Sequence, residues 1–392
     1  MKVAVLIMSF DIAPYTPGGI GTVSLEHVRF YKKKGFDVCV LGPKKSNIVF
    51  PVTGIQYFGL PLKGNLRKLF LCCFHLPFIL IKYRIAFVVA IQGTYAGILA
   101  SLIKILFRIP FFVLAHGNDF IRFQKSALIK FLLKKIFCYS NCVFSNSKFI
   151  KTKLIQFGVS ESKIETIFCG VDTEAFQLAD SREIARFYKK FGISDDDFLL
   201  ITVSRLDKRK GHIETLKAIK HIKDNSPEVG ERIRYIIVGN GPNLSSIAAE
   251  ISTNKLSRQV ELAGYIKSEE LAIYLSAADA FIMPNKYLEN DGSIEGFGIV
   301  FLEAAACGTC SIGGKSGGTS DAIVDGKTGF LVDGNDPLCI AEKIELLATD
   351  PTLRERLSNT AHERARKDFG WDRILHNELR IIDKKRKATE AV

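Results

Sequence analysis

The stretch Phe198-Leu-Leu-Ile-Thr-Val-Ser-Arg-Leu-Asp-Lys-Arg-Lys-Gly211 determines the fold class of this chain. A run of residues that favour a buried strand leads into a basic turn, and a helix is predicted to begin after Gly211. When such strand-turn-helix units are repeated along a chain, they predict a parallel sheet that is covered by helices on both faces.

The same unit recurs in both halves of the sequence. The second half continues with predicted strands at 235–238, 260–263 and 280–283, and with helices after Gly211, after Pro242 and over 269–277. The first half has predicted strands at 3–9, 37–41, 86–91, 111–115 and 142–145, and a helix over 22–34. We therefore predict an α/β protein with two doubly wound, Rossmann-like domains that face a central cleft.

Length and composition agree with two globular domains. The chain has 392 residues, of which 47% are apolar and 24% charged, so disorder and a fibrous architecture are excluded. We place the first domain at 1–172 and the second at 173–368, because the basic composition ends near this point. Residues 369–392 are predicted to form a polar helix that crosses back to the first domain.

The net charge of +13 is concentrated in the first half of the chain. Residues 1–192 contain 27 basic and 10 acidic residues, and residues 38–160 contain 17 basic residues and one acid, Asp119. Such a segment predicts an anionic partner: nucleic acid, a phosphate-bearing small molecule or a membrane surface. Bulky apolar residues lie among the cations at 69–81 and 105–113, which favours a lipid interface. For any one segment, core packing with a basic outer face is an equally good explanation.

No stretch of the sequence is predicted to span a membrane. The uncharged run 69–81 is too short, and polar residues interrupt 85–103. The N-terminus leads into a strand without a signal-peptide cleavage site, so we predict a cytoplasmic protein, peripheral on the inner face of the cell membrane. Nine scattered cysteines fit a reducing compartment, and Cys307-Gly-Thr-Cys310 lacks a second Cys/His pair for a metal.

Ligands of parallel sheets bind beyond the carboxyl ends of the strands, so the loops there are candidate sites. Pro17-Gly-Gly-Ile-Gly21 would let the backbone approach an anion, although a plain tight turn is an equally good interpretation. In Ala115-His-Gly-Asn-Asp119, His116 and Asp119 could orient an acceptor hydroxyl and receive its proton. A loop histidine and a capping aspartate would explain the same residues.

The loop Ser204–Gly211 carries a candidate phosphate site. Arg205 and Lys210 can converge on one phosphate group, the arginine as a planar fork and the lysine as a point charge. The remaining cations, Lys208 and Arg209, are predicted to belong to a solvated basic turn.

The segment Glu295-Gly-Phe-Gly-Ile-Val-Phe-Leu-Glu303 is the strongest local signal. A loop carboxylate precedes a helix start, and a second carboxylate lies inside the helix. Free N–H groups at the helix start can face a diphosphate while the two glutamates bracket it. Burial of Glu303 among apolar neighbours would be costly unless a ligand or partner uses it.

Taken together, these motifs resemble the retaining, metal-independent glycosyltransferases of the GT-B fold, within the family 4-like, group 1 enzymes. The resemblance covers nearly the whole chain. It rests on the glycine loop at 18–21, His116-Gly, Ser204-Arg-Leu with Lys210-Gly, Val238-Gly-Asn-Gly-Pro242, the pair Glu295 and Glu303, Gly317-Gly318, and Asp325-Gly-Lys-Thr-Gly-Phe-Leu331. The loop Glu289-Asn-Asp-Gly-Ser-Ile-Glu-Gly-Phe-Gly is most similar to the phosphatidylinositol mannosyltransferase branch.

The resemblance implies a role for each matching residue. Arg205 and Lys210 would hold the donor diphosphate, Glu303 the nucleotide ribose, and Glu295 the sugar. The further donor-binding candidates are Gly19, Ile266, Gly296, Phe297, Gly298 and Ile299. His116 would face the donor sugar and the acceptor, and the catalytic candidates are His116, Asp119 and Glu295.

The resemblance also implies that the enzyme needs no metal or other cofactor, because cations and a helix N-terminus stabilise the leaving diphosphate. Asp195-Asp196-Asp197 could suggest a metal-binding motif. It precedes a strand instead of following one, so we expect a surface turn there.

The implied function is retaining transfer of a mannose- or glucose-type hexose from a nucleotide-diphosphate sugar to a hydroxyl. The acceptor would be a glycan or lipid-linked molecule in cell-envelope polysaccharide, lipopolysaccharide or glycolipid synthesis. Expected partners are donor, acceptor and an anionic membrane surface, without nucleic acid. Two alternatives remain: a non-hydrolysing nucleotide-sugar epimerase on the same fold, and a non-catalytic membrane-binding module. The sequence leaves the donor base, the sugar and the linkage open.

Overall fold

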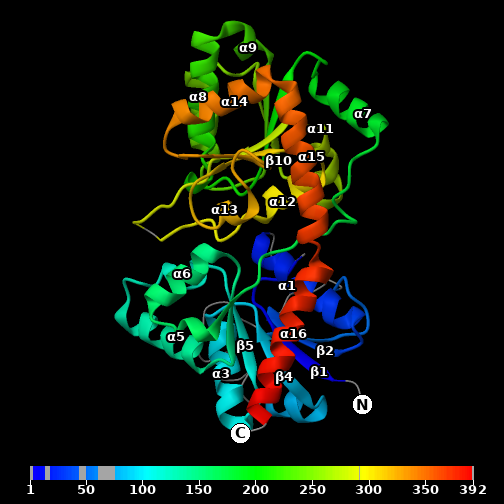
Figure 1. The fold of residues 1–392 in the computed structure, drawn as a ribbon, viewed down its shortest axis with the longest axis vertical. Helices are drawn as coiled ribbons and strands as arrows, with labels where there is room; N and C mark the ends of the chain where they lie inside the picture. Colours follow the sequence, from blue (N-terminus) through cyan, green and yellow to red (C-terminus); the bar gives the residue numbers. More distant parts are fainter. Residues whose placement is uncertain (1–2, 14–17, 44–49, 61–75, 291, 391–392) are drawn as a thin grey trace. The chain divides into compact units, whose positions relative to one another are not determined.

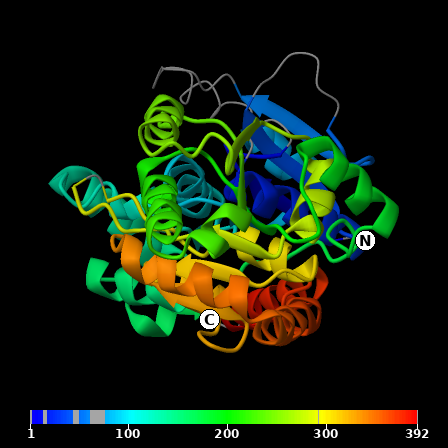
Figure 2. The same ribbon diagram turned by 90° about the horizontal axis from the view of Figure 1, so that it is seen from above.

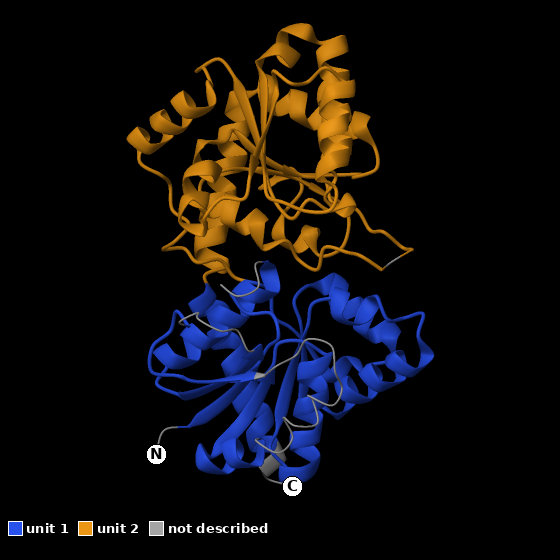
Figure 3. Ribbon diagram, turned by 180° about the vertical axis from the view of Figure 1, so that it is seen from behind, with its two compact units in different colours: residues 1–169, 371–392 blue, residues 170–370 orange. Residues whose placement is uncertain are grey.

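The structure is a computed structural model that describes residues 3–13, 18–43, 50–60, 76–290 and 292–390. The chain divides into two compact units, which Figure 3 distinguishes by colour. Unit 1 comprises residues 1–169 and 371–392, and unit 2 comprises residues 170–370. The sequence-based boundaries were 172/173 and 368/369. Pro17 of the glycine loop and most of the apolar stretch 69–81 lie outside the described residues.

Unit 1 contains a parallel sheet of seven strands in the order β3-β2-β1-β4-β5-β6-β7 (Figure 1). The inner strands are buried on both faces, which is why they appear in the sequence as continuous apolar runs. The strands are β1 (Ala4–Met8), β2 (Asp37–Pro43), β3 (Gln56–Leu60), β4 (Ile85–Ala90), β5 (Phe111–Ala115), β6 (Cys142–Ser145) and β7 (Ile164–Thr166). The five strands predicted for this half are confirmed, and β3 and β7 were not predicted.

The helices of unit 1 connect its strands, apart from the last helix of the chain. Among the described residues they are α1 (Gly19–Lys33), α3 (Tyr95–Phe107), α4 (Asn118–Ile121), α5 (Ala127–Tyr139), α6 (Lys148–Phe157) and α16 (Trp371–Glu390), with further helical residues at 76–82 and a 3₁₀ turn η1 (Glu161–Lys163). Helix α16 packs beside α1, where Nε2 of buried His27 lies 3.1 Å from Oε2 of buried Glu378. The C-terminal helix is therefore part of unit 1.

Unit 2 contains a parallel sheet of six strands in the order β10-β9-β8-β11-β12-β13. They are β8 (Phe198–Val203), β9 (Ile233–Val238), β10 (Val260–Gly264), β11 (Ala280–Met283), β12 (Ser311–Gly314) and β13 (Gly329–Val332). One continuous apolar core joins the strands to helices on one face of this sheet. Figure 2 shows one of them, the orange helix α14 (Pro337–Thr349), lying against the strands.

The other helices of unit 2 follow the same alternation with strands. They are α7 (Ser181–Phe191), α8 (His212–Asn225), α9 (Pro227–Arg232), α10 (Leu244–Thr253), α11 (Leu271–Ala277), α12 (Ile299–Ala306), α13 (Thr319–Ala322) and α15 (Pro351–Asp368), with 3₁₀ turns η2 (Lys208–Lys210) and η3 (Ser268–Glu270). The prediction of two doubly wound domains is therefore confirmed. That they face a common cleft stays a prediction.

Each sheet has one point where the direction of strand addition reverses. In unit 1 this switch point lies between β1 and β4, and in unit 2 it lies between β8 and β11. The helices that follow these two strands pack on opposite faces of the sheet, so the loops diverge and leave room for a ligand. The candidate loops 204–211 and 284–298 follow β8 and β11, so the unit 2 switch point is a candidate ligand site.

The close approach of these two loops requires glycine at position 211. Gly211 has a φ of +78°, and a Cβ atom there would lie 2.3 Å from the carbonyl oxygen of Pro284. Gly192 offers a matched control, since its φ is +62° but no atom lies within 4 Å of its would-be Cβ.

We expect Gly211→Ala to lower the free energy of unfolding by about 2–4 kcal/mol, because it adds a steric clash to the backbone strain. Gly192→Ala should cost only about 1 kcal/mol, from the backbone strain alone. Urea unfolding of the full chain measures both. Equal losses in the two variants would show that the loops do not depend on this approach.

Candidate functional site

Backbone contacts hold together the loops that follow β8, β11 and β12. The amide of Lys286 donates to the carbonyl of Arg209 at 2.8 Å, and the amide of Gly318 donates to the carbonyl of Glu295 at 3.0 Å. A Cβ atom at Gly317, whose φ is +70°, would lie 2.0 Å from that same carbonyl oxygen. Glycine at 317 therefore lets the β12 loop fix the backbone of Glu295.

The carboxylate of Glu295 is nearly buried, and two cations neutralise it. Nη1 of Arg209 lies 2.7 Å and Nζ of Lys210 lies 2.5 Å from the same oxygen, Oε2. The side chains are 14% (Arg209), 10% (Lys210) and 13% (Glu295) exposed. Burial alone would raise the pKa of the Glu295 carboxyl, but Lys210 and Arg209 outweigh burial and lower the pKa to about 2. Glu295 is therefore an anion at neutral pH.

The prediction that Arg209 belongs to a solvated basic turn is wrong. Its guanidinium folds onto Glu295, whereas the neighbouring Lys208 is exposed. Residues 208–210 form the 3₁₀ turn η2, whose residue spacing differs from that of a loop or an α-helix. In the sequence, Lys208, Arg209 and Lys210 form one run of cations in the loop after β8. Composition alone does not show which of these side chains face inward.

Arg205 engages a different carboxylate from Lys210. Its Nε and Nη2 both donate to the carboxylate of Asp207 at 2.9 Å, and its side chain is 71% exposed. A phosphate would have to compete with Asp207 for this planar fork. The proposed convergence of Arg205 and Lys210 on one phosphate therefore stays a prediction.

The start of helix α12 lies directly after Glu295 in the chain. Gly298 caps the helix in a left-handed conformation with a φ of +87°, and no side chain caps the first amides. Gly296 and Phe297 are buried, and Ile299 is half-buried. An uncapped helix start beside two cations favours an anionic group.

Glu303 lies in α12, and its carboxyl makes no hydrogen bond or ion pair with any residue in the described part of the chain. Burial raises the pKa of this carboxyl to about 7. Glu303 as a whole is half-buried, and the desolvation of its carboxyl costs free energy that a hydrogen-bonding partner would offset. A hydroxyl of a ligand is a partner that suits both of its protonation states.

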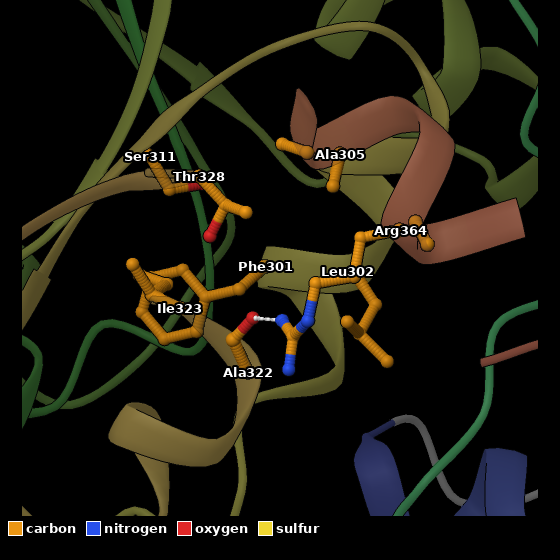
Figure 4. Close-up of a pocket in the computed structure, with 10 residues that line it drawn as sticks. Phe301, Leu302, Ala305, Ser311, Ala322, Ile323, Thr328 and Arg364 are labelled. Atoms are coloured by element: carbon orange, nitrogen blue, oxygen red, sulfur yellow. Dashed lines mark hydrogen bonds between the residues drawn. The ribbon is translucent and has the colours of Figure 1, made fainter. Parts of the chain in front are cut away.

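A small cavity separates α12 from α15 (Figure 4). Phe301 and Leu302 line it from α12, and Nη1 of Arg364 crosses it to donate to the carbonyl of Ala322 at 2.6 Å. The space accommodates about one water molecule. This cavity is therefore a gap in the packing behind α12, too small for a sugar or a nucleotide.

His116 follows β5 in unit 1, beside the β1/β4 switch point. Its Nε2 lies 2.8 Å from the carbonyl of Ile91, so in the neutral ring Nε2 carries the proton and Nδ1 keeps the lone pair. Nδ1 lies 3.5 Å from Nδ2 of Asn146. Burial lowers the pKa of His116, and the carboxylate of Asp119 partly opposes this. Only Nδ1 is available as a proton acceptor.

The carboxylate of Asp119 accepts hydrogen bonds from backbone amides. Oδ1 accepts hydrogen bonds from the amides of His116 and Gly117 at 3.0 and 2.9 Å, and Oδ2 accepts one from the amide of Gly93 at 3.1 Å. These amides precede α4 or belong to another loop, so Asp119 does not cap that helix as the alternative proposed; it is a positioning residue for the His116 loop. A further contact at this switch point, Nε2 of Gln92 to Oδ2 of Asp11 at 2.7 Å, carried no sequence signal.

Two further residues predicted to bind the donor do not belong to the loops that follow β8, β11 and β12. Gly19 is the exposed first residue of α1 in unit 1. Ile266 is buried and follows β10, the edge strand of the unit 2 sheet. Their roles stay predictions.

The described residues contain neither a cluster of metal ligands nor a membrane-spanning helix. Across the described ranges, no group of three or more His, Cys, Asp or Glu side chains is arranged to hold a metal ion. Among the helices that the structure describes, none combines the length and the apolar character needed to cross a bilayer.

Doubly wound parallel sheets, with cations and an uncapped helix start at a switch point, are features with which α/β proteins commonly bind phosphate-bearing ligands. Residues 17–175 match the family described as Glycosyltransferase Family 4, and residues 183–364 match Glycosyl transferases group 1. The chain belongs to these glycosyltransferases.

Curated relatives share about a third of the aligned residues. A D-inositol 3-phosphate glycosyltransferase of Streptomyces bingchenggensis is 32% identical over 55% of this chain and 47% of its own length. A GDP-mannose-dependent alpha-(1-6)-phosphatidylinositol monomannoside mannosyltransferase of Mycolicibacterium smegmatis is 27% identical over 70% of each chain. The chain thus spans about half the length of the first relative.

Solved structures support the fold. Sucrose-phosphate synthase of Thermosynechococcus elongatus superposes with a TM-score of 0.84 at 20% identity, covering 100% of both chains. Anabaena HepE in complex with UDP and glucose gives a TM-score of 0.80 at 17% identity, covering 97% of this chain and 100% of its own. The fold is therefore GT-B.

The raised pKa of Glu303 predicts a pH-dependent stability. In the unfolded chain this carboxyl titrates near 4.5, and in the folded chain near 7. Between these values the folded state binds more protons, so ionisation of Glu303 destabilises the fold as pH rises. Glu303→Gln removes this effect.

The melting temperature of Glu303→Gln should equal that of the unmodified chain near pH 4.5 and exceed it by a few degrees at pH 8, since each pKa unit is worth about 1.4 kcal/mol. Glu269→Gln, at an exposed carboxyl of η3, serves as the control. A difference that does not change with pH would contradict the raised pKa of Glu303.

Proposed function

We propose that this chain is a retaining glycosyltransferase that moves a mannose- or glucose-type hexose from a nucleotide-diphosphate sugar to a hydroxyl. The acceptor is a glycan or a lipid-linked molecule of cell-envelope polysaccharide, lipopolysaccharide or glycolipid synthesis. The observation that carries the proposal is Glu295, an anion held by Lys210 and Arg209 beside the uncapped start of α12. A GDP-mannose-dependent relative and a structural neighbour that binds UDP and glucose support the donor class.

In this proposal unit 2 binds the donor through charge. Lys210 and the first amides of α12 bind the diphosphate, and Arg205 joins them by releasing Asp207. Glu303 binds the ribose hydroxyls through the carboxyl that has no partner among the described residues. Oε1 of Glu295, the oxygen that neither cation contacts, accepts hydrogen bonds from the hexose.

The chemistry follows from these positions. The bond between the anomeric carbon and the phosphate oxygen breaks, and its electron pair stays on the departing nucleotide diphosphate. The acceptor oxygen bonds to the same face of the sugar, and its proton passes to the departing phosphate, so configuration is retained. Lys210 and the α12 dipole stabilise the leaving charge. They supply the charge that a metal ion would supply, so the proposal includes no metal.

His116 is proposed to bind the substrate as a neutral imidazole. Its Nδ1 keeps a lone pair, and burial lowers the pKa of the ring, so a substrate hydroxyl can donate to Nδ1 at neutral pH in place of the long 3.5 Å contact with Nδ2 of Asn146. Asp119 holds the backbone of this loop in place and does not touch the substrate.

The donor proposal is tested by a screen of GDP-, UDP- and ADP-sugars for thermal stabilisation. A true donor at 100 times its dissociation constant should add about 2.7 kcal/mol of stability. With that donor and an acceptor, Lys210→Ala should lower kcat/KM by about 100-fold or more, because it removes charge from the leaving diphosphate. Lys208→Ala, at the exposed cation of the same turn, should keep the rate.

Three outcomes would contradict the proposal. Undiminished transfer by folded Lys210→Ala would remove the role of that lysine. Loss of transfer in EDTA, restored by a divalent cation, would remove the metal-independent mechanism. Conversion of the nucleotide sugar without any acceptor would favour the epimerase alternative.

We propose in addition that unit 1 binds the inner face of the cell membrane through the first half of α5. Four apolar side chains are exposed there, with Leu128 68% and Phe131 56% exposed. The remaining two are Ile129 and Leu132. Lys130, Lys134 and Lys135 are exposed on the same helix, and Nζ of Lys135 lies 5.4 Å from the centre of the Phe131 ring. Apolar side chains flanked by lysines suit an anionic lipid surface.

The other end of α5 is fixed to unit 1. Nζ of Lys104 donates to the carbonyl of Tyr139 at 2.8 Å, and Nζ of Lys163 donates to the carbonyls of Cys138 and Ser140 at 2.6 and 2.8 Å. Two cations at a helix C-terminus stabilise it through the helix dipole. The exposed half therefore sits on a rigid base.

Vesicle flotation tests this surface. The full chain should bind anionic vesicles more tightly than zwitterionic ones at low salt, and high salt should weaken the binding. Replacing Leu128 and Phe131 by Ser should lower the anionic partition constant by about 10-fold or more, since each buries apolar area in the lipid. Leu338→Ser, at an exposed leucine of unit 2, should change nothing. Equal binding to both lipid types would contradict the membrane proposal.

A further inference from the structure

Arg209 and Lys210 both bind the same oxygen of the Glu295 carboxylate. Both cations donate to Oε2, at 2.7 and 2.5 Å, and neither contacts Oε1. The backbone carbonyl of Arg209 is fixed by the amide of Lys286, and the backbone carbonyl of Glu295 by the amide of Gly318. The main freedom left to the Glu295 carboxylate is rotation of its own side chain.

One cation would be sufficient to balance the charge of Glu295, and the structure supplies two. A diphosphate that binds Lys210 draws that lysine toward itself and weakens its contact with Glu295. Without a second cation, the carboxylate would turn with Lys210 to keep its ion pair, because an unpaired buried charge is strongly unfavourable, and Oε1 would no longer be directed at the sugar. Arg209 prevents this, because its guanidinium holds Oε2 in place while Lys210 turns to the diphosphate.

No other cation of the loop is placed to do this. Arg205 is held by both oxygens of Asp207, and Lys208 is exposed. Arg209 is nearly buried, and its planar group holds a carboxylate in a defined orientation better than an ammonium group does.

We infer that Arg209 is a positioning residue for the donor sugar. It holds Oε2 of Glu295, so that Oε1 stays directed at the hexose when Lys210 engages the diphosphate. Arg209 itself contacts neither the sugar nor the phosphates. This inference rests on the proposed function, because it needs a nucleotide-diphosphate sugar in the unit 2 site.

The inference predicts a weaker affinity for the nucleotide sugar but not for the nucleoside diphosphate. A general loss of structure would lower both affinities. Arg209→Ala should weaken binding of the nucleotide sugar and lower kcat/KM by about 10- to 100-fold, because a misplaced contact costs that much. Binding of the matching nucleoside diphosphate, which has no sugar, should stay within about twofold. Isothermal titration calorimetry measures both. Lys208→Ala is the matched control. The nucleotide-sugar affinity of Arg209→Lys should lie between those of Arg209→Ala and Lys208→Ala, since lysine keeps the charge without the planar fork.

A double variant keeps the test valid if Arg209→Ala folds poorly. Glu295→Gln removes the buried charge that Arg209 neutralises, so Arg209→Ala should cost little further sugar-nucleotide affinity in the Glu295→Gln background. This coupling isolates the action of Arg209 through Glu295.

Each possible pattern of affinities either supports or contradicts the positioning role of Arg209. Loss of sugar-nucleotide affinity alone, coupled to Glu295, supports the inference. Equal loss of both affinities would mean that Arg209 binds the phosphates directly and would overturn it, as would unchanged affinities or additive losses in the double variant. If the unmodified chain binds nucleoside diphosphates but no nucleotide sugar, the proposed function itself fails.

Discussion

A largely buried carboxylate needs cations or hydrogen-bond donors around it, and at Glu295 the loops of unit 2 supply two cations. The β8 loop brings Arg209 and Lys210 to one of its oxygens, and the β12 loop binds its backbone carbonyl. These loops come from three adjacent strands of a parallel sheet. The site therefore exists only where the sheet, the switch point and the closely approaching glycines occur together.

Different surroundings give the chemically identical carboxyl groups of Glu295 and Glu303 different pKa values. Burial acts on both, yet the pKa of Glu295 falls to about 2 beside two cations, while that of Glu303 rises to about 7 without a described partner. The first carboxyl is satisfied within the chain and holds a fixed charge. The second has no partner among the described residues, and in the proposed function it binds the ribose hydroxyls. A site that binds a diphosphate at one end and neutral hydroxyls at the other needs this division.

The sequence was sufficient for the features that depend on periodicity and chain order. Apolar runs located the inner strands except β12 (Ser311–Gly314), which contains one bulky apolar residue, and strand-end loops located Lys210, Glu295 and the start of α12. It failed where the outcome depends on packing. Edge strands β3, β7 and β13 have only five, three and four residues and were not predicted. The direction of Arg209 depends on a 3₁₀ turn, and the partners of Asp119 are amides of two separate loops. Contacts between distant segments leave no periodic trace.

The structure also explains the single acid of the basic segment 38–160. Asp119 is buried and accepts three backbone hydrogen bonds, so it is required by the fold and adds no exposed negative charge to unit 1. An acid on the surface of α5 would repel an anionic membrane, whereas one that is fully bonded inside the loop does not. Under the proposed membrane contact, the lack of other acids in this segment and the burial of Asp119 both leave the charge of α5 positive.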